Sequence, residues 1–170
     1  VVNDLGGSGS GEGADEAPAK TIADEIKAAG GEATPNFGNV AEWDGAQSII
    51  QTALDAYGQI DGVVNNAGIL RDRIFHKMSE AEWDAVVAVN LTGVFNVSRA
   101  AAPHFKAQGS GAFVHMTSTS GLIGNFGQVN YGAAKMAMLG FMNVLALEGA
   151  SHNIKVNALA PGAATRMTAT

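Results

Sequence analysis

Two residue types with proton chemistry lie one helical turn apart in the run YGAAK, from Tyr131 to Lys135. A separation of four places both side chains on one face of a helix. A lysine ammonium at that distance favours the phenolate and lowers the pKa of the tyrosine from its ordinary value near ~10. Such a tyrosine can donate or accept a proton at neutral pH. Because this spacing also arises by chance, the pair alone is equally compatible with a purely structural role.

Polar and glycine residues elsewhere in the chain provide a chemical context for this pair. Ser118 precedes Tyr131 by 13 residues and follows an apolar run, so its hydroxyl is available to bond a substrate carbonyl. Asn90 lies in the apolar run VNLTGVF, where a buried amide needs a partner or a bound water. Two further runs follow predicted strands: NNAG at Asn65–Gly68 and PGAAT at Pro161–Thr165.

The elements that must position these residues alternate between short strands and helices, which is typical of βαβ units on a parallel sheet. In such sheets, ligands bind beyond the carboxyl ends of the strands, where Asp4, Asn65 and Thr117–Ser118 fall. The stretch Ser118–Gln128 shows no clear element, and a long loop of this kind often carries function. Strands are predicted at Val1–Asp4, Glu32–Phe37, Asp61–Asn65, Gly111–Thr117 and Ile154–Leu159, and helices at Asp15–Ala29, Ala41–Tyr57, Glu80–Gln108 (after a Ser79 cap) and Val129–Ala150.

The glycine-rich run near the start, VVNDLGGSGSGEG, does not match the phosphate-binding pattern G-x-G-x-x-G in any frame. Its acids Glu12, Asp15 and Glu16 would also repel a phosphate. The run is therefore interpreted as a flexible solvated loop. The informative residue is Asp4, an acid at the end of a strand, although a turn-forming role before the glycines is also open.

Composition excludes several classes of function. The chain has 170 residues, 46% hydrophobic residues and a net charge of −6, which fit about one globular domain and argue against nucleic-acid binding. It contains no cysteine, which excludes disulfides. The longest uncharged apolar stretch, Met136–Leu147, is shorter than the ~20 residues of a membrane span. No metal site is expected, because the four histidines are far apart: His76, His104, His115 and His152.

With these motifs in order, the chain resembles the short-chain dehydrogenases/reductases of the single-domain Rossmann type. The resemblance runs from Val1 to Thr170 and includes NNAG, Asn90, Ser118, the Tyr131/Lys135 pair and PGAAT. VVNDLGG, NNAGILRDR and GNFGQVNYGAAK further resemble the (3R)-hydroxyacyl-CoA dehydrogenase modules of type 2 peroxisomal multifunctional enzymes and their bacterial relatives. Reductases of 3-oxoacyl carrier proteins share much of this pattern.

The resemblance implies catalytic roles by position. Tyr131 would be the general acid and base, and Lys135 would lower its pKa and bind the nicotinamide ribose. Ser118 would hold the carbonyl, and Asn90 would fix a water that connects Lys135 to solvent. The non-catalytic alternative, a nucleotide-binding or scaffold protein, would be marked by loss of Tyr, Lys or Ser, and all three are present.

The resemblance also implies a cofactor site. Asp4 would bond the adenosine ribose and repel a 2′-phosphate, so NAD is expected in preference to NADP. In place of the family's usual Asp-Val pair after the third strand, this chain has Asn39 and Val40, and an Asn oxygen can still accept from the adenine amine. The other implied contacts are Asn65, Ala67 and Gly68 on the adenosine side and Pro161, Gly162 and Thr165 on the nicotinamide side.

The implied fold is a doubly wound parallel sheet of order 3-2-1-4-5-6-7 from which the first strand, its glycine-rich phosphate loop and the C-terminal end are missing. The sequence is therefore expected to be one partial domain, 1–170, of a longer chain, or to leave a gap in the sheet.

The expected activity is NAD-dependent interconversion of a secondary alcohol and a ketone, most specifically of 3-hydroxyacyl-CoA and 3-oxoacyl-CoA in fatty-acid metabolism. A 3-oxoacyl reductase or another secondary-alcohol dehydrogenase is the alternative. Helices Glu80–Gln108 and Val129–Ala150 are apolar nearly all round, which predicts a homodimer or homotetramer without membrane attachment. A cytoplasmic location is expected if the source is bacterial.

Overall fold

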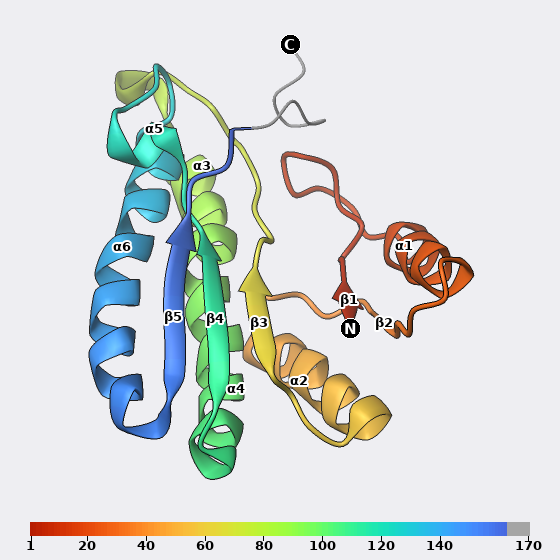
Figure 1. Cartoon of the computed structure of the whole chain (residues 1–170). Helices are drawn as coiled ribbons and strands as arrows, with labels where there is room; N and C mark the ends of the chain where they lie inside the picture. Colours follow the sequence, from red (N-terminus) through yellow and green to blue (C-terminus); the bar gives the residue numbers. More distant parts are fainter. Residues whose placement is uncertain (163–170) are drawn as a thin grey trace.

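The fold consists of parallel strands joined by helices and is seen in a computed structural model that describes residues 1–162 (Figure 1). The N-terminal part contains β1 (Val2–Asn3), α1 (Ala17–Ala28), β2 (Pro35–Asn36) and α2 (Trp43–Tyr57). It leads to β3 (Gly62–Asn65) and a 3₁₀ turn (Phe75–Lys77). The predicted class, an α/β fold with parallel strands, is confirmed.

The second part alternates helices with the remaining strands. It contains α3 (Glu80–Val87), a π-helical segment (Ala88–Thr92), α4 (Gly93–Gln108) and β4 (Gly111–Met116). The chain continues through α5 (Thr119–Leu122), α6 (Val129–Gly149), a 3₁₀ turn (Ala150–His152) and β5 (Ile154–Leu159).

The strands form two separate parallel sheets, β1-β2 and β3-β4-β5. Val2 pairs with Pro35 in the first sheet, and Val63, Phe113 and Val156 share one register level in the second. The neighbouring strands β1 and β3 are not hydrogen-bonded to each other (Figure 1). The sheet is thus interrupted between these strands, where the expected order places a further strand.

The main core lies between the three-stranded sheet and the helices on one of its faces. Phe105 of α4 packs against Phe113 of β4 with ring centroids 4.8 Å apart, and both are fully buried. The opposite face of this sheet is more open among the described residues, because Val64 is 66% exposed and Leu159 is 51% exposed. Strand residues that alternate in sequence point to opposite faces, so this contrast follows from the strand period of two.

The predicted helix Glu80–Gln108 is interrupted by the π-helical segment, which contains Asn90. Its predicted start is confirmed, since the Ser79 hydroxyl accepts from the Glu82 N–H at 3.2 Å and Glu82 bonds back to the Ser79 N–H at 2.8 Å. By length and composition alone the stretch Glu80–Gln108 could cross a membrane, since an 18-residue window within it has a mean hydropathy of 1.3. In the fold, α4 directs Val97 and Phe105 into the core, which accounts for that hydropathy.

The glycine-rich run after β1 has no helix or strand and is mostly exposed, as expected for a solvated loop, and it is also hydrogen-bonded to the body of the fold. The Leu70 N–H donates to the Gly9 carbonyl and the Arg71 Nε donates to the Ser10 carbonyl, both at 2.9 Å. Gly11 has a φ of 84°, a backbone conformation that favours glycine, and a β-carbon on it would lie 2.8 Å from the Ile69 Cδ1.

Candidate active site

Tyr131 and Lys135 share one face of α6, as their spacing predicts. The Lys135 Nζ lies 5.6 Å from the centroid of the Tyr131 ring and donates to the Met116 carbonyl at 2.8 Å. Only 4% of Lys135 is exposed, and this burial lowers the pKa of its ammonium to about 8. The lysine therefore connects α6 to the carboxyl end of β4, and burial of its positive charge destabilises the fold.

The predicted direction of the Tyr131 pKa shift was wrong for the protein without ligand. Burial of the phenol raises its pKa, hydrogen bonding with Ser118 lowers it, and the negative charge of Asp72 raises it. The net shift is upward, because desolvation disfavours the phenolate more than the Ser118 hydroxyl stabilises it. The Lys135 ammonium lies over the ring and bonds to a backbone carbonyl, so it adds no direct bond to the phenol oxygen.

Ser118 lies where β4 ends and α5 begins. Its hydroxyl accepts from the Ser120 N–H at 3.1 Å and caps α5. The neighbouring Thr117 hydroxyl donates to the Lys135 carbonyl at 2.6 Å, which ties the end of β4 to the middle of α6. Ser118, Tyr131 and Lys135 are thus brought together by one strand end and one helix.

Asn90 is fully buried and faces Gly68 and Lys135. Its Nδ2 donates to the Ile69 and Val86 carbonyls, each at 3.0 Å, while its Oδ1 has no hydrogen-bond partner among the described residues. A β-carbon on Gly68 would lie 2.5 Å from that oxygen and 3.7 Å from the Lys135 Nζ. Glycine at position 68 therefore leaves space beside the Asn90 Oδ1 and the Lys135 ammonium. Asn90 reaches this space from the π-helical segment.

Asn65, which the resemblance places on the adenosine side, directs its side chain into the core. Its Nδ2 bonds to the Ser98 hydroxyl at 3.0 Å and to the His115 Nδ1 at 3.1 Å. All three side chains are buried between β3, β4 and α4. Strand alternation directs this side chain into the core, so only the backbone at position 65 can face a ligand on the other side.

The remaining predicted cofactor residues lie mainly at the edge of the fold. Asp4 is exposed, and its Oδ1 accepts from the Gly6 N–H at 2.7 Å. The Asn39 Oδ1 accepts from the Ala41 N–H at 3.0 Å, and the Val40 carbonyl accepts from the Asn96 side chain at 3.0 Å. The Ala67, Pro161 and Gly162 positions are exposed, and Thr165 lies outside the described residues.

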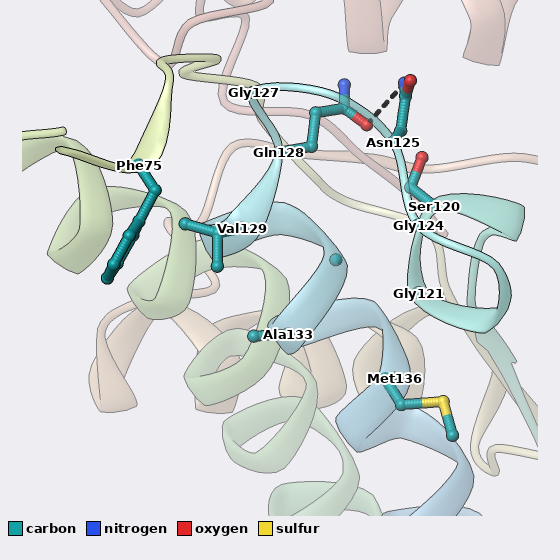
Figure 2. Close-up of a pocket in the computed structure, with 11 residues that line it drawn as sticks. Phe75, Ser120, Gly121, Gly124, Asn125, Gly127, Gln128, Val129, Ala133 and Met136 are labelled. Carbon is teal, nitrogen blue, oxygen red and sulfur yellow. Dashed lines mark hydrogen bonds between the residues drawn. The ribbon is translucent and has the colours of Figure 1, made fainter. Parts of the chain in front are cut away.

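A pocket of about 430 Å³ lies on a different face of α6 (Figure 2). Val129, Gly132, Ala133 and Met136 line it, and this spacing selects one helical face, away from Tyr131 and Lys135. Phe75 stands at another side of the pocket. We therefore place the reacting groups outside this pocket, on the face of α6 that meets β4.

Sequence reasoning missed three residues next to the site: Asp72, Gln128 and Asn130. The Asn130 side chain is fully buried and bonds to the Arg71 and Glu82 carbonyls at 3.0 and 3.1 Å. Its signal was an amide in the first turn of an otherwise apolar helix. Within residues 1–162, no group of three or more His, Cys, Asp or Glu side chains is placed to hold a metal ion.

Comparison with known proteins identifies the family. The sequence model of the short chain dehydrogenase family matches residues 12–170. The chain belongs to this family. Within it, the chain is 60% identical over 168 residues to a short-chain type dehydrogenase/reductase of Mycobacterium tuberculosis, covering 99% of this chain and 59% of that protein.

Other relatives and a solved structure of the family agree with this assignment. The peroxisomal multifunctional enzyme type 2 of Mus musculus is 47% identical over 170 residues, which cover 100% of this chain and 23% of that enzyme. The crystal structure of a short chain dehydrogenase from Mycobacterium avium matches with a TM-score of 0.88 and 44% identity, over 99% of this chain and 60% of that one. The chain thus spans less than two thirds of the length of each of these proteins.

Proposed function

We propose that this chain forms the catalytic part of an NAD-dependent oxidoreductase that interconverts a secondary alcohol and a ketone. The observation that carries the proposal is the convergence of Ser118, Tyr131 and Lys135 at the end of β4, with the free Asn90 oxygen behind the lysine. Family membership supports an oxidoreductase that uses NAD or NADP.

Each residue has one task in this proposal. The Ser118 hydroxyl bonds the substrate oxygen. The Tyr131 phenolate takes the alcohol proton during oxidation, and the resulting phenol returns it during reduction. Bound NAD would accept the hydride from the alcohol carbon. The Lys135 ammonium sits beside the phenol, and its low pKa suits the exchange of a proton near neutral pH. The Asn90 Oδ1 offers an acceptor for a water that passes this proton to solvent.

The residues present fit the two ends of a dinucleotide. At the nicotinamide end, Lys135 lies next to Tyr131, and Asn90 offers a buried oxygen that has no partner among the described residues. On the adenosine side, Gly68 has no side chain to hinder a close approach. At the adenosine end, the exposed Asp4 follows β1, where a carboxylate would bond the two ribose hydroxyls and repel a 2′-phosphate. We therefore propose NAD rather than NADP, with Asn39 and Val40 at the adenine.

For the substrate we propose a 3-hydroxyacyl thioester, most specifically 3-hydroxyacyl-CoA. The support is the similarity to peroxisomal multifunctional enzymes type 2 and to the peroxisomal hydratase-dehydrogenase-epimerase of Saccharomyces cerevisiae, which is 49% identical over 168 residues. In a bacterial source the enzyme would act in the cytoplasm.

We also propose that the complete protein has a strand between β1 and β3 and assembles as a homodimer or homotetramer. The interrupted sheet supports the strand. The dimer is supported by a groove of about 540 Å³ between α4 and α6, which includes Phe95, Phe141 and Val144. Because Phe95 is 49% exposed and Val144 is 57% exposed, a second copy on these helices would remove a large apolar surface from water. Light scattering of the full-length protein should therefore give at least the mass of a dimer, and an active monomer would contradict this assembly.

The test of function is a set of steady-state rates for the full-length protein. The substrates are 3-hydroxyacyl-CoA esters of several chain lengths and the matching acyl carrier protein thioesters, each with NAD and with NADP. We expect the highest kcat/KM for a CoA ester with NAD. A preference for 3-oxoacyl carrier protein with NADPH would favour the reductase alternative, and absence of turnover with every pair would contradict the proposed function.

A further inference from the structure

Residues 71–73 hydrogen-bond to residues 127–130, the segment that leads into α6, and we call this contact the seat. The Arg73 N–H donates to the Gly127 carbonyl at 2.8 Å, and the Asn130 Nδ2 donates to the Arg71 carbonyl at 3.0 Å. Between these two bonds, the Gln128 Nε2 donates to the Asp72 Oδ2 at 2.7 Å. The two segments therefore run past each other in opposite directions and are joined at three successive points.

This seat reaches the backbone of Tyr131 through Asn130. The Asn130 Oδ1 accepts from the Tyr131 N–H at 2.8 Å, while its Nδ2 bonds to Arg71 and to the Glu82 carbonyl of α3. Asn130 is fully buried, so these bonds are made in a region of low dielectric, where they hold their geometry strongly. Residues 71–73 are thus linked through Asn130 to the backbone from which α6 presents Tyr131.

Asp72 is the one member of residues 71–73 whose side chain makes a bond across this seat. Arg71 and Arg73 contribute backbone atoms to it. The donor to Asp72, Gln128, is only 9% exposed, and its Oε1 accepts from the Asn125 Nδ2 at 3.1 Å. Gln128 is therefore held between Asn125 and Asp72, just before the helix that carries the tyrosine.

We propose that Asp72 is a positioning residue for Tyr131: its carboxylate holds Gln128, and with it the turn from which the helix of the tyrosine begins. This inference rests on the proposed role of Tyr131 in proton transfer. Nothing in the seat requires Asp72 to touch the substrate or the cofactor. Asp72 acts on Tyr131 in two ways: through the hydrogen bond that it accepts from Gln128 and through the negative charge of its carboxylate.

The charge of Asp72 gives the proposal a second readout. This carboxylate raises the pKa of Tyr131, in the same direction as burial and against the effect of Ser118. Several other charged side chains on the packed elements have partners of their own in the structure. Arg73 pairs with Glu82 at 3.1 Å, the Arg71 Nε bonds to Ser10, and Lys135 bonds to Met116. Removing the charge at position 72 should therefore let the phenol ionise at lower pH.

Two substitutions of Asp72 separate the effect of its hydrogen bond with Gln128 from the effect of its negative charge. Asp72→Asn keeps an oxygen that can accept from Gln128 and removes the negative charge. Asp72→Ala removes both, and Gln128→Ala removes the same bond from its other end. Matched controls come from α2, where the Gln51 Nε2 donates to the Asp55 Oδ1 at the same 2.7 Å in an exposed pair. Asp55→Asn and Asp55→Ala make the same chemical changes away from Tyr131.

The experiment measures kcat, KM and phenol ionisation in the full-length protein. We expect Asp72→Ala and Gln128→Ala each to lower kcat about tenfold with little change in KM for NAD, because the proton-transferring phenol is misplaced. The double variant should be no slower than either single variant, since both remove one bond. Asp72→Asn should keep most of kcat and shift the Tyr131 titration to lower pH, and the Asp55 variants should change neither quantity.

Titration of the phenol is read from ultraviolet absorbance as the difference between each protein and its Tyr131→Phe derivative, so this arm does not depend on turnover. Wild-type kcat in Asp72→Ala, additive losses in the double variant, or an unchanged titration midpoint in Asp72→Asn would each overturn the inference. A wild-type protein without oxidoreductase activity would overturn the proposed function instead. In that case the Asp72→Asn titration would still test the link between Asp72 and Tyr131.

Discussion

The N-terminal unit of β1, α1 and β2 is built differently from the body that carries the reacting groups. Within residues 1–40, the buried apolar side chains are all alanines, Ala19, Ala23 and Ala33, whereas the body buries Phe105, Phe113 and Met138. Asp4 is exposed on the first unit, while Asn90 and Lys135 are enclosed in the second. The proposed reacting groups therefore lie in a region with large buried side chains. The residue proposed to discriminate between NAD and NADP, Asp4, lies in a region with few and small buried side chains.

The largest expected effect lies in the body. Tyr131→Phe should lower kcat by about a thousandfold or more, because it removes the hydroxyl that moves the substrate proton. The affinity for NADH should change little, since the ring and the surrounding contacts remain. Stopped-flow or steady-state rates with a 3-hydroxyacyl-CoA ester check this, and retention of more than about a tenth of the wild-type kcat would count against Tyr131 as the acid and base.

Lys135→Met should separate activity from stability within the same body. Turnover should fall by about a hundredfold or more, since the proton route loses its ammonium. Stability should not fall in parallel: the folded-state pKa of about 8 lies below the ordinary 10.5, so burial of this lysine destabilises the fold fully below pH 8. This cost is relieved as the pH rises from about 8 to 10.5.

Chemical denaturation of wild type and Lys135→Met at pH 7 and pH 9.5 measures this cost. We expect the variant to be at least as stable as wild type at pH 7, with the difference shrinking at pH 9.5. Lys135→Arg is a useful control because it keeps a buried cation that does not titrate in this range. A large loss of stability in Lys135→Met at pH 7 would mean that the bond to Met116 outweighs the cost of burying the charge.

A smaller effect, on stability alone, is expected at His115. This side chain is fully buried beside Phe113 and Phe141, and burial lowers its pKa to about 4 from 6.5. The unfolded chain therefore binds the proton first, and stability that is complete above pH 6.5 is lost as the pH falls toward 4. Thermal unfolding of the full-length protein at pH 7.5 and pH 5 should show this loss, and His115→Phe should reduce it. Equal pH dependence in both proteins would place the acid sensitivity elsewhere.

The smallest expected effect lies at the N-terminal edge. Asp4→Ala should reduce kcat/KM with NAD by roughly tenfold and narrow the gap to NADP, because ribose hydrogen bonds and repulsion of the 2′-phosphate are both lost. Folding should be unaffected, since Asp4 is exposed and its side chain bonds only to the Gly6 N–H among the described residues. Kinetics with both cofactors check the ratio, and an unchanged ratio would return Asp4 to the role of a turn residue.

Local sequence patterns predicted the elements of both regions but not how each is packed. The Ser79 cap, the end of α2 at Gly58 and the shared face of Tyr131 and Lys135 follow from neighbours in the chain, and all appear in the structure. In α1, the spacing of Ile22 and Ile26 puts them on one helical face, yet both are exposed while Ala19 and Ala23 are buried. Helical periodicity identifies a face but not the element that covers it.

The parts of the site that sequence reasoning missed depend on contacts between distant segments. The π-helical turn around Asn90, the inward direction of Asn65 and the seat of Asp72 under Gln128 each involve residues more than 20 positions apart. The pKa of Tyr131 was misjudged for the same reason, because burial is a property of the assembled fold. Spacing predicted which groups meet, while tertiary packing set their electrostatics.

The central claim is that proton transfer depends on the body of the fold, which contains Tyr131, whereas the preference for NAD over NADP depends on the N-terminal unit, which contains Asp4. NADH binding to the full-length wild type, Tyr131→Phe and Asp4→Ala, followed by the fluorescence of the bound cofactor, tests it most directly. The account predicts that Tyr131→Phe binds NADH within about twofold of wild type although it has lost turnover, and that Asp4→Ala binds roughly tenfold more weakly. Loss of NADH binding in Tyr131→Phe together with unchanged binding in Asp4→Ala would contradict it.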